Sequence, residues 1–324
     1  MNDRATLVSK VLVLDSNTEC YDQIKLFCDT HNLVGLKVHE ENVLPVLKSN
    51  IDLGGILLSE SYGGNDNGGI ALAREIHRIR PELPIFLRRE EIPYPDNLSG
   101  KDRKLFSASY TIADIASLRS AIDASIFSQV YPNALIRGIV ELTITALESQ
   151  FNDMGIDVEA PYLVRDRLIF GEIFTMIPLE SSWCRGYMML QVEEEPLLHL
   201  VRAERTHTAS DNNNDFRHLN NILGEITNLI WGTFKNRYIS HSDNIAQLSQ
   251  VPIIVNHLHR YISFGSEDPQ LCFKYTLNAK NDKDVLPLTI YQRFVFNLNW
   301  SPDDFKVNQV SVEAWFESGE LELF

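Results

Sequence analysis

The sequence lacks the features that mark membrane and secreted proteins. No stretch approaches the ~20 uninterrupted apolar residues that a membrane-spanning helix requires. The N-terminus carries an acid at Asp3 and only a short apolar run at Val11–Leu14. This pattern differs from that of a secretory signal. We therefore expect a cytoplasmic protein that does not insert into a membrane.

Motifs for metal and nucleotide chemistry are also missing. The four cysteines, Cys20, Cys28, Cys184 and Cys272, have no zinc-site spacing. In the cytoplasm they are expected to be reduced thiols. The nine histidines form no metalloenzyme pattern such as H-E-x-x-H, and no phosphate-binding G-x-x-x-x-G-K-[ST] occurs. The sequence thus predicts neither a metal site nor a cofactor of its own.

Basic residues are scarce relative to acidic ones. There are 29 Lys and Arg against 44 Asp and Glu, which gives a net charge of −15. A nucleic-acid-binding protein needs a basic face to neutralise phosphates, so this balance argues against one. The hydrophobic content of 44% is typical of a soluble globular protein rather than a disordered one.

The length of 324 residues predicts two domains. Pro132 disfavours a continuing helix at the residue before it, so we place the boundary beside Tyr131. The predicted domains span 1–130 and 131–303. Residues 304–324 form an acidic tail with alternating apolar positions, which fits either an added strand or a docking peptide.

Short apolar runs alternate with amphipathic segments in the first domain. This alternation predicts βαβ units and a doubly wound parallel sheet, an α/β fold. The predicted strands are Val11–Leu14, Ile56–Leu58 and Pro84–Leu87, and the predicted helices are Cys20–Thr30, Ile70–Ile79 and Ile115–Phe127.

The run Val11-Leu-Val-Leu-Asp15, with Gly55–Ser59 and Leu83–Leu87, resembles a response-regulator receiver domain. The resemblance implies a CheY-like, flavodoxin-like fold. A working receiver has an acidic pair that holds Mg²⁺ after its first strand, an acceptor Asp after the third, and a hydroxyl residue and a Lys after the later strands. Here Ser16 follows Asp15, Ser59 stands at the acceptor position and Arg88 replaces the hydroxyl.

These departures predict a degenerate receiver that is not phosphorylated. One carboxylate makes a poor Mg²⁺ site, since that ion is usually held by carboxylates together with phosphate oxygens. Two alternatives stay open. Glu60 could mimic a phosphorylated Asp, or the domain could be a surviving phosphorelay receiver that switches the second domain.

The second half combines a long amphipathic helix with runs rich in β-branched and aromatic residues. This mixture predicts an α+β domain. The helix is expected over 133–152. The predicted strands are Leu168–Ile177, Cys184–Val192, Val251–His257, Leu271–Leu277 and Tyr291–Leu298, with Glu193–Glu195 as the polar end of a strand or a turn.

A second helix is predicted over Phe216–Lys235, where apolar residues recur at helical spacing. Glu225 and Asn228 lie three residues apart and therefore project as neighbours from one face. Gly224 and Gly232 each weaken a helix by about 1 kcal/mol, which suggests a close neighbour or a functional surface. A polar outer face is also what any amphipathic helix presents to solvent.

The segment Gly224-Glu225-Ile-Thr-Asn228-Leu-Ile-Trp-Gly232 resembles the Glu-x-x-Asn helix of the CheX/CheC/FliY phosphatase family. The resemblance spans about 132–300, and the single motif is more like CheX than CheC. It implies chemotaxis or two-component signalling and a phosphatase that acts on the phospho-Asp of a CheY-like response regulator. It also implies a homodimer.

The resemblance assigns a role to each polar residue. Asn228 would orient the attacking water with its neutral amide, as a Gln does in small GTPases. Glu225 would pair with a Lys of the phosphorylated partner and fix the docking register. The Mg²⁺ that neutralises the phosphoryl group would belong to the partner receiver.

Two interpretations of the whole chain compete. In the first, the chain is a phosphatase, and its degenerate receiver domain serves regulation, dimerisation or targeting. In the second, it is a non-catalytic binding module that docks a response regulator or a flagellar or chemotaxis component. Binding without release of phosphate separates the two.

Overall fold

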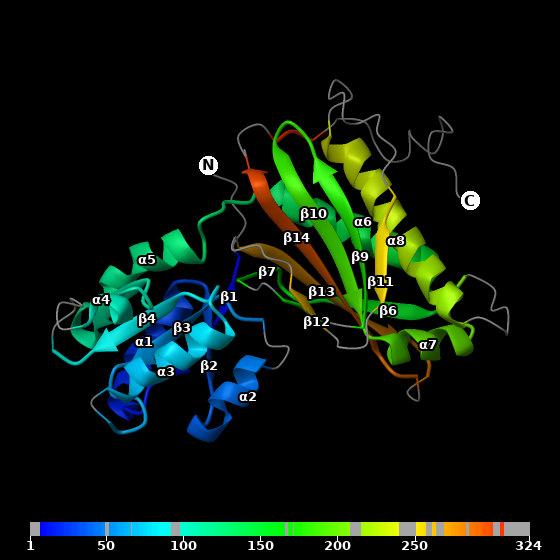
Figure 1. The fold of residues 1–324 in the computed structure, drawn as a ribbon. Coiled ribbons are helices and arrows are strands. Elements are labelled where there is room, and N and C mark those ends of the chain that lie inside the picture. Colours follow the sequence, from blue (N-terminus) through cyan, green and yellow to red (C-terminus); the bar gives the residue numbers. More distant parts are fainter. Residues whose placement is uncertain are drawn as a thin grey trace.

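The computed structural model contains two large β-sheets, each with its own helices, and a two-stranded pair (Figure 1). We call them the parallel unit, from β1 to α5, and the antiparallel unit, from α6 to β14. The described residues are 7–48, 52–65, 67–91, 98–165, 168–170, 172–207, 215–239, 251–256, 261–263, 269–282, 285–300 and 305–307.

The parallel unit has five parallel strands in the order β2-β1-β3-β4-β5. This is a doubly wound order of the flavodoxin-like type. The CheY-like fold predicted from the sequence is therefore confirmed. The strands are β1 (Ser9–Leu14), β2 (Leu33–Lys37), β3 (Gly55–Ser59), β4 (Ile85–Arg89) and β5 (Ala108–Thr111).

Helices cover both faces of this sheet because alternate strand residues point to opposite sides. Val11 and Val13 pack with α1 and α5, whereas Leu12 and Leu14 pack with α2 and α3. The helices are α1 (Thr18–Thr30), α2 (Val43–Lys48), α3 (Gly68–Ile79), α4 (Gly100–Arg103) and α5 (Leu118–Ser125), with 3₁₀ turns η1 (Glu40–Asn42) and η2 (Ile112–Ser117).

The last helix of the parallel unit begins later than predicted. The sequence indicated a helix from Ile115, but a 3₁₀ turn occupies that position and α5 starts at Leu118. Asp114 has non-helical backbone angles, and its carbonyl accepts a hydrogen bond from Ser117 Oγ at 2.7 Å. The local side-chain bond competes with the helical ladder, as Ser and Asp commonly do.

The antiparallel unit has a sheet in the order β11-β9-β10-β14-β13-β6, with β7 also pairing with β13. It joins helices to an antiparallel sheet, which confirms the predicted α+β class. The strands are β6 (Met154–Val158), β7 (Tyr162–Val164), β9 (Ile173–Glu180), β10 (Cys184–Val192), β11 (Ile253–Asn256), β13 (Gln270–Ala279) and β14 (Leu288–Trp300); β8 (Leu168–Phe170) and β12 (Tyr261–Ser263) form a separate pair.

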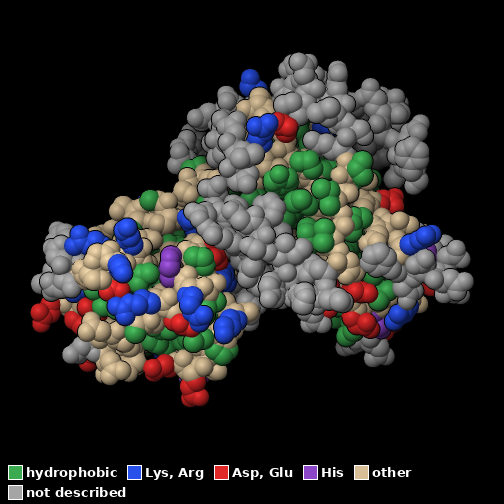
Figure 2. Space-filling model, in the orientation of Figure 1, with side chains coloured by type: hydrophobic (Ala, Val, Ile, Leu, Met, Phe, Trp, Pro, Cys, Tyr) green, Lys and Arg blue, Asp and Glu red, His purple; other side chains and the backbone are tan. Residues whose placement is uncertain are grey.

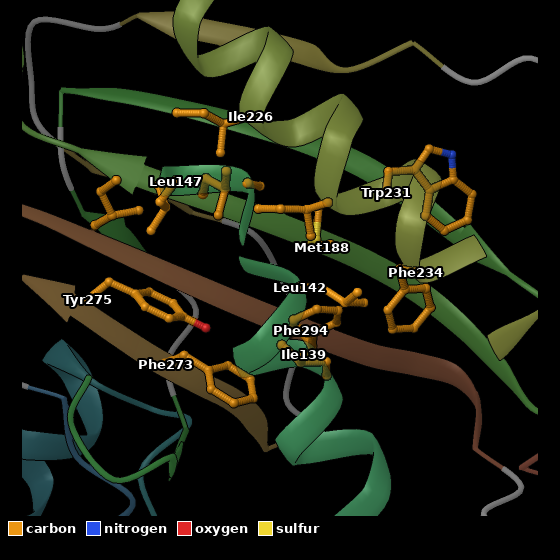
Figure 3. Close-up of a cluster of buried hydrophobic side chains, with 14 of the residues drawn as sticks. Ile139, Leu142, Leu147, Met188, Ile226, Trp231, Phe234, Phe273, Tyr275 and Phe294 are labelled. Atoms are coloured by element: carbon orange, nitrogen blue, oxygen red, sulfur yellow. The ribbon is translucent and has the colours of Figure 1, made fainter. Parts of the chain in front are cut away.

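Three helices pack on one face of this sheet and enclose its core. They are α6 (Asn133–Gln150), α7 (Glu194–Arg202) and α8 (Asp215–Tyr238). Figure 3 shows Leu142 of α6 and Phe234 of α8 beside Phe294 of β14. Burial of these large side chains is the main source of stability, at about 25 cal/mol for each Å² of apolar surface.

The opposite face of the sheet carries a smaller apolar cluster. Phe174, Met189 and Val295 are buried there, with Met176 and Val255 packed against them. Hydrophobic side chains gather on the face of this unit that Figure 2 presents to the viewer.

Two segments of the antiparallel unit differ from the prediction. Glu193–Glu195 is not the end of a strand, because α7 begins at Glu194. Acidic residues are favourable in a first turn, and Pro196 lies where backbone N–H groups have no helical partner. The single strand predicted over Leu168–Ile177 is divided between β8 and β9.

Strand β7 connects the two units through backbone hydrogen bonds. Tyr162 forms a parallel bridge with Val8, just before β1, and Leu163 N donates to the Val8 carbonyl at 2.9 Å. Ser9 Oγ donates to the Leu163 carbonyl at 2.7 Å, and the Ser9 residue is fully buried. A short strand of the second sheet therefore lies against the start of the first.

Buried charges reinforce this contact. Asp52, in the loop before β3, accepts hydrogen bonds from Tyr162 OH at 2.7 Å and from Arg293 Nη2 at 3.1 Å. The side chains of Arg293 and Asp52 are 3% and 9% exposed. Arg293 also donates to Gln270 Oε1 at 3.3 Å. An ion pair buried to this degree needs such extra hydrogen bonds to offset its desolvation.

The described part of the chain contains no helix that is both long and apolar enough to cross a membrane. Of the predicted tail, only 305–307 are described, and the rest of 304–324 lies outside the described residues. Phe305 packs edge-on against Trp183, with ring centroids 5.1 Å apart.

Candidate functional site

Helix α8 carries the predicted site and is anchored by a stripe of apolar residues. Leu219, Ile222, Leu223, Ile226 and Ile230 are all buried, and each lies three or four residues from another member of the set. This spacing places them on one side of the helix, against α6, α7 and β9. Figure 3 shows Ile226 pointing from α8 into the core.

The opposite side of α8 is a polar stripe, which we define as Asn221, Glu225, Asn228, Gly232 and Lys235. Its members follow one another at intervals of four, three, four and three residues, which keeps them on one face. Asn221 and Asn228 are exposed, and the other three are half-buried. The structure therefore brings Glu225 and Asn228 together on an accessible surface, as the sequence predicts.

A buried hydroxyl pair fixes the rotation of α8 at the motif. Thr227 Oγ1 lies 2.6 Å from Thr175 Oγ1 of β9, and both residues are fully buried. Thr227 Oγ1 also donates to the Leu223 carbonyl at 2.7 Å. Successive helical residues are about 100° apart. Holding Thr227 inward therefore holds the next residue, Asn228, outward.

Strand β11 supports the helix beside the motif. A Cβ atom added at Gly224 would lie 3.4 Å from Ile254 Cδ1. Ile254 is paired with Thr175 across the β11–β9 ladder. Thr175 and Ile254 thus brace the motif helix from adjacent strands. Local sequence patterns do not predict the role of either residue, because the pairing of β11 with β9 joins segments about 80 residues apart.

Neither polar side chain of the motif is used within the described part of the fold. Glu225 and Asn228 form no hydrogen bond or ion pair with any other described residue. Toward the described residues, both amide donors and the carbonyl acceptor of Asn228 are therefore unused, as is the carboxylate of Glu225. Together they place a negative charge and a neutral amide on one face of α8.

The other long helix does not repeat this arrangement. Helix α6 carries Glu141 on its exposed side, but Arg237 Nη1 donates to this carboxylate at 2.9 Å. Glu148, also exposed, has no Asn three residues later. The Glu-x-x-Asn pair therefore occurs on one helix of the antiparallel unit.

A second polar cluster lies at the carboxyl ends of β1, β3 and β4, where a receiver would hold its phosphoryl group. Arg88 fills this position. Its Nε donates to Asp15 Oδ2 at 2.5 Å and its Nη2 donates to Asp15 Oδ1 at 3.1 Å. Both side chains are 2% exposed. The guanidinium thus engages both oxygens of the one carboxylate left from the acidic pair.

The residues around Arg88 complete an internal network. Ser59, at the acceptor position, is buried and accepts a hydrogen bond from Arg88 Nη2 at 2.8 Å. Burial alone would lower the pKa of Arg88, but hydrogen bonds with Asp15 and Glu90 outweigh it and raise the pKa. The hydrogen bond from Arg88 lowers the pKa of Glu90. Arg88 and Glu90 therefore favour their charged forms, and they are paired.

This geometry does not fit a Mg²⁺-dependent receiver. The carboxylate that would ligate the ion is already held by a fixed cation. Glu60 is paired elsewhere, because Arg89 Nε donates to its carboxylate at 2.7 Å. Neither the phosphorelay alternative nor mimicry by Glu60 gains support from these contacts. Within the described residues, no three His, Cys, Asp or Glu side chains form a candidate metal cluster.

Comparisons with known proteins give structural neighbours only. No family model matches the chain. No curated protein matches it either. A putative chemotaxis protein from Desulfovibrio vulgaris Hildenborough has a TM-score of 0.36 and 15% identity, and covers 49% of this chain and 96% of its own.

Two further solved structures are similar to parts of the chain. The chemotaxis protein CheX from Desulfovibrio desulfuricans has a TM-score of 0.34 and 11% identity, over 49% of this chain and 97% of its own. A sensor protein from Polaromonas sp. JS666 has a TM-score of 0.32 and 13% identity, over 36% of this chain and 94% of its own. At these values the likenesses assign no function.

Proposed function

We propose that the chain is a phosphatase for the aspartyl phosphate of a CheY-like response regulator in two-component or chemotaxis signalling. The observation that carries the proposal is the outward-facing pair of Glu225 and Asn228 on α8. Both polar groups are free of partners among the described residues, and a buried hydroxyl pair fixes their direction. The surrounding sequence motif is the one that the resemblance associates with this activity.

Asn228 is proposed to position the attacking water. Its amide carbonyl would accept a hydrogen bond from a water molecule held in line with the P–O bond of the phospho-Asp. The water oxygen would bond to phosphorus while the P–O bond to the Asp carboxylate breaks. Inorganic phosphate would then leave. The partner's own Mg²⁺ would neutralise charge on the phosphoryl oxygens.

Glu225 is proposed to dock the partner. An unpaired carboxylate three residues before Asn228 would form a charge-assisted hydrogen bond with a Lys beside the partner's phosphorylation site. Such a bond contributes about 1.5–3 kcal/mol and would fix the register of the amide relative to phosphorus. Glu225 would act mainly on binding, and Asn228 mainly on the chemical step.

The parallel unit is proposed to serve regulation, assembly or targeting rather than phosphoryl transfer. Arg88 takes the place of an exchangeable cation there, and Ser59 is not an acceptor carboxylate. A further proposal from the family resemblance is that two copies associate. Strand β11 is a candidate edge for this contact because its Ile253 is 51% exposed.

The test is the loss of phosphate from purified, Mg²⁺-loaded phospho-receivers of the same organism. We expect the intact chain to accelerate this loss. Asn228→Ala should reduce the acceleration by about 10²-fold at saturating receiver. Glu225→Gln should chiefly raise KM, by about tenfold or more. Glu148→Gln, at an exposed position of α6, is the matched control and should behave like the wild type.

Binding measured beside turnover separates this proposal from its alternative. If a receiver binds the wild-type chain but loses phosphate no faster, the Glu225–Asn228 surface is a docking module without catalysis. If Asn228→Ala retains full acceleration, the assignment of the positioning residue is wrong.

A further inference from the structure

Asn228 stands between two glycines on the surface of α8. Gly224 precedes it by four residues and Gly232 follows it by four, so the three lie in one row along the helix. Glycine is among the least favourable residues for a helix interior. The presence of two glycines, one on each side of the exposed Asn228, therefore needs a physical explanation.

Packing among the described residues supplies no reason for Gly232, because a Cβ atom added there would have none of their heavy atoms within 4 Å. Gly138 of α6 shows the contrast, because a Cβ there would lie 1.5 Å from Tyr238 OH, where the two helices approach closely. The close helix contact thus requires glycine at 138, whereas none of the described residues occupies the space above Gly232.

The direction of helical side chains determines which residue a side chain at position 232 would cover. Each Cα–Cβ bond tilts toward the helix N-terminus, so a side chain covers the turn before its own Cα. A side chain at 232 would therefore lean over Asn228. The Asn228 side chain itself leans toward Gly224 and Glu225. Gly232 leaves bare backbone on the C-terminal side of the amide, whereas Ile254 of β11 lies beside Gly224 on the other side.

We propose that the bare backbone at Gly232, one turn beyond Asn228, leaves room for the rim of a receiver's phosphorylation site, and that Gly232 is a positioning residue. This inference rests on the proposed phosphatase function. An Asn side chain is short, so the α8 backbone must come close to the partner for the amide to reach a water beside phosphorus. Any side chain at 232 would meet the partner first.

The negative charge of Glu225, beside Asn228, is complementary to the same partner. The Glu225 carboxylate lies beside Asn228 and has no internal cation among the described residues. It complements the Lys expected beside a phospho-Asp. Bare backbone at Gly232, close to one amide and one carboxylate, suits a surface that carries a phosphoryl group at its centre and a cation at its edge.

The experiment substitutes Gly232 with residues of graded size in the full chain. Gly232→Ala should lower kcat/KM for the phospho-receiver by about threefold to tenfold, and Gly232→Leu by about 10²-fold or more. Neither should lower the melting temperature, because the site is open and both residues favour helix more than glycine does. Thr145→Leu, on the exposed face of α6, adds bulk elsewhere and should retain wild-type kcat/KM.

Titration calorimetry with the same receiver, activated by beryllofluoride, is the second measurement. We expect Gly232→Leu to weaken binding in parallel with kcat/KM. Full activity and affinity in Gly232→Leu would overturn the clearance role while leaving the phosphatase proposal intact. A wild-type chain that binds receivers without turnover would refute the phosphatase, and the calorimetric series would still decide the clearance role. A wild-type chain that binds no receiver overturns both.

Discussion

A single residue, Arg88, determines the chemistry of the cluster at the carboxyl ends of β1, β3 and β4. In the sequence, Arg88 only marks a departure from the receiver pattern. In the structure it reaches back 73 residues to Asp15 and donates to both carboxylate oxygens. Asp15 and Arg88 sit at the ends of different parallel strands, so their meeting follows from the sheet topology rather than from local spacing.

Removing Arg88 should destabilise the parallel unit strongly. Arg88→Met leaves the buried Asp15 carboxylate without its cation, and loss of one partner from a buried pair costs about 3–5 kcal/mol. The double variant Arg88→Met/Asp15→Leu should recover most of this loss, because no uncompensated charge remains. Urea unfolding measures both.

The exposed pair of Arg74 and Asp102 supplies the control for this experiment. The Arg74 side chain is 59% exposed. Arg74→Met should therefore change stability by less than about 1 kcal/mol. Equal effects of Arg74→Met and Arg88→Met would contradict the structural role assigned to Arg88.

Two buried thiols make stability depend on alkaline pH. Burial raises the pKa of Cys28 to about 12, and that of Cys184 to about 12, from an ordinary value of 9.0. The folded chain therefore holds these protons more tightly than the unfolded chain. Their contribution is fully present below pH 9.0 and is lost as the pH rises toward 12.

The expected outcome is that neither thiol reacts with a thiol reagent at pH 8 until the chain is unfolded. The free energy of unfolding should fall between pH 9 and pH 11. In Cys184→Ala this fall should be shallower than in the wild type. Rapid labelling of the native chain at Cys28 or Cys184 would show that the burial is wrong.

At the scale of elements, α8 depends on its hydroxyl contact with β9. Thr227→Val removes the hydroxyl that Thr175 contacts and leaves a buried polar group without its partner, which costs about 1–3 kcal/mol. Thr175→Val/Thr227→Val removes both groups and should be nearly neutral. Thermal unfolding monitors both variants.

The phosphatase assay adds a second measurement to this pair. If the contact sets the rotation of α8, Thr227→Val should also lower the turnover that depends on Asn228. Retention of wild-type stability by Thr227→Val would show that the hydroxyl contact contributes nothing.

Local pattern predicted the elements whose burial has a regular period. The 3.6-residue spacing of apolar residues indicated α8 and placed Glu225 and Asn228 on its outer face, where the fold has them. It did not indicate α7, where Glu193–Glu195 and Pro196 give no apolar period at the start of the helix. Nor could it distinguish Gly138, where packing requires glycine, from Gly232, where no described residue would contact an added Cβ atom.

At the scale of the whole molecule, the two units share a buried polar interface. Local patterns cannot predict this interface, because Asp52 and Arg293 are 241 residues apart in sequence. The fold classes of the two units followed from the sequence, but their contact did not. It depends on a short strand, β7, which is only three residues long.

Breaking this interface should uncouple the two units. Asp52→Ala leaves Arg293 without its carboxylate and Tyr162 without its acceptor, so we expect a loss of about 3–5 kcal/mol. Differential scanning calorimetry should give one transition for the wild type and two for Asp52→Ala. Asp123→Ala, in an exposed ion pair, is the control and should leave the transition unchanged. One unshifted transition in Asp52→Ala would contradict coupling through this contact.

The position of β7 also has a consequence for synthesis on the ribosome. All five strands of the parallel unit precede β7 in the chain, whereas β13, its partner in the second sheet, is made more than 100 residues later. Domains generally fold N-terminal first as the chain emerges. The residues before β1 can therefore hold β7 while β13 is still untranslated. The finished first unit would then serve as a template that places one strand of the second.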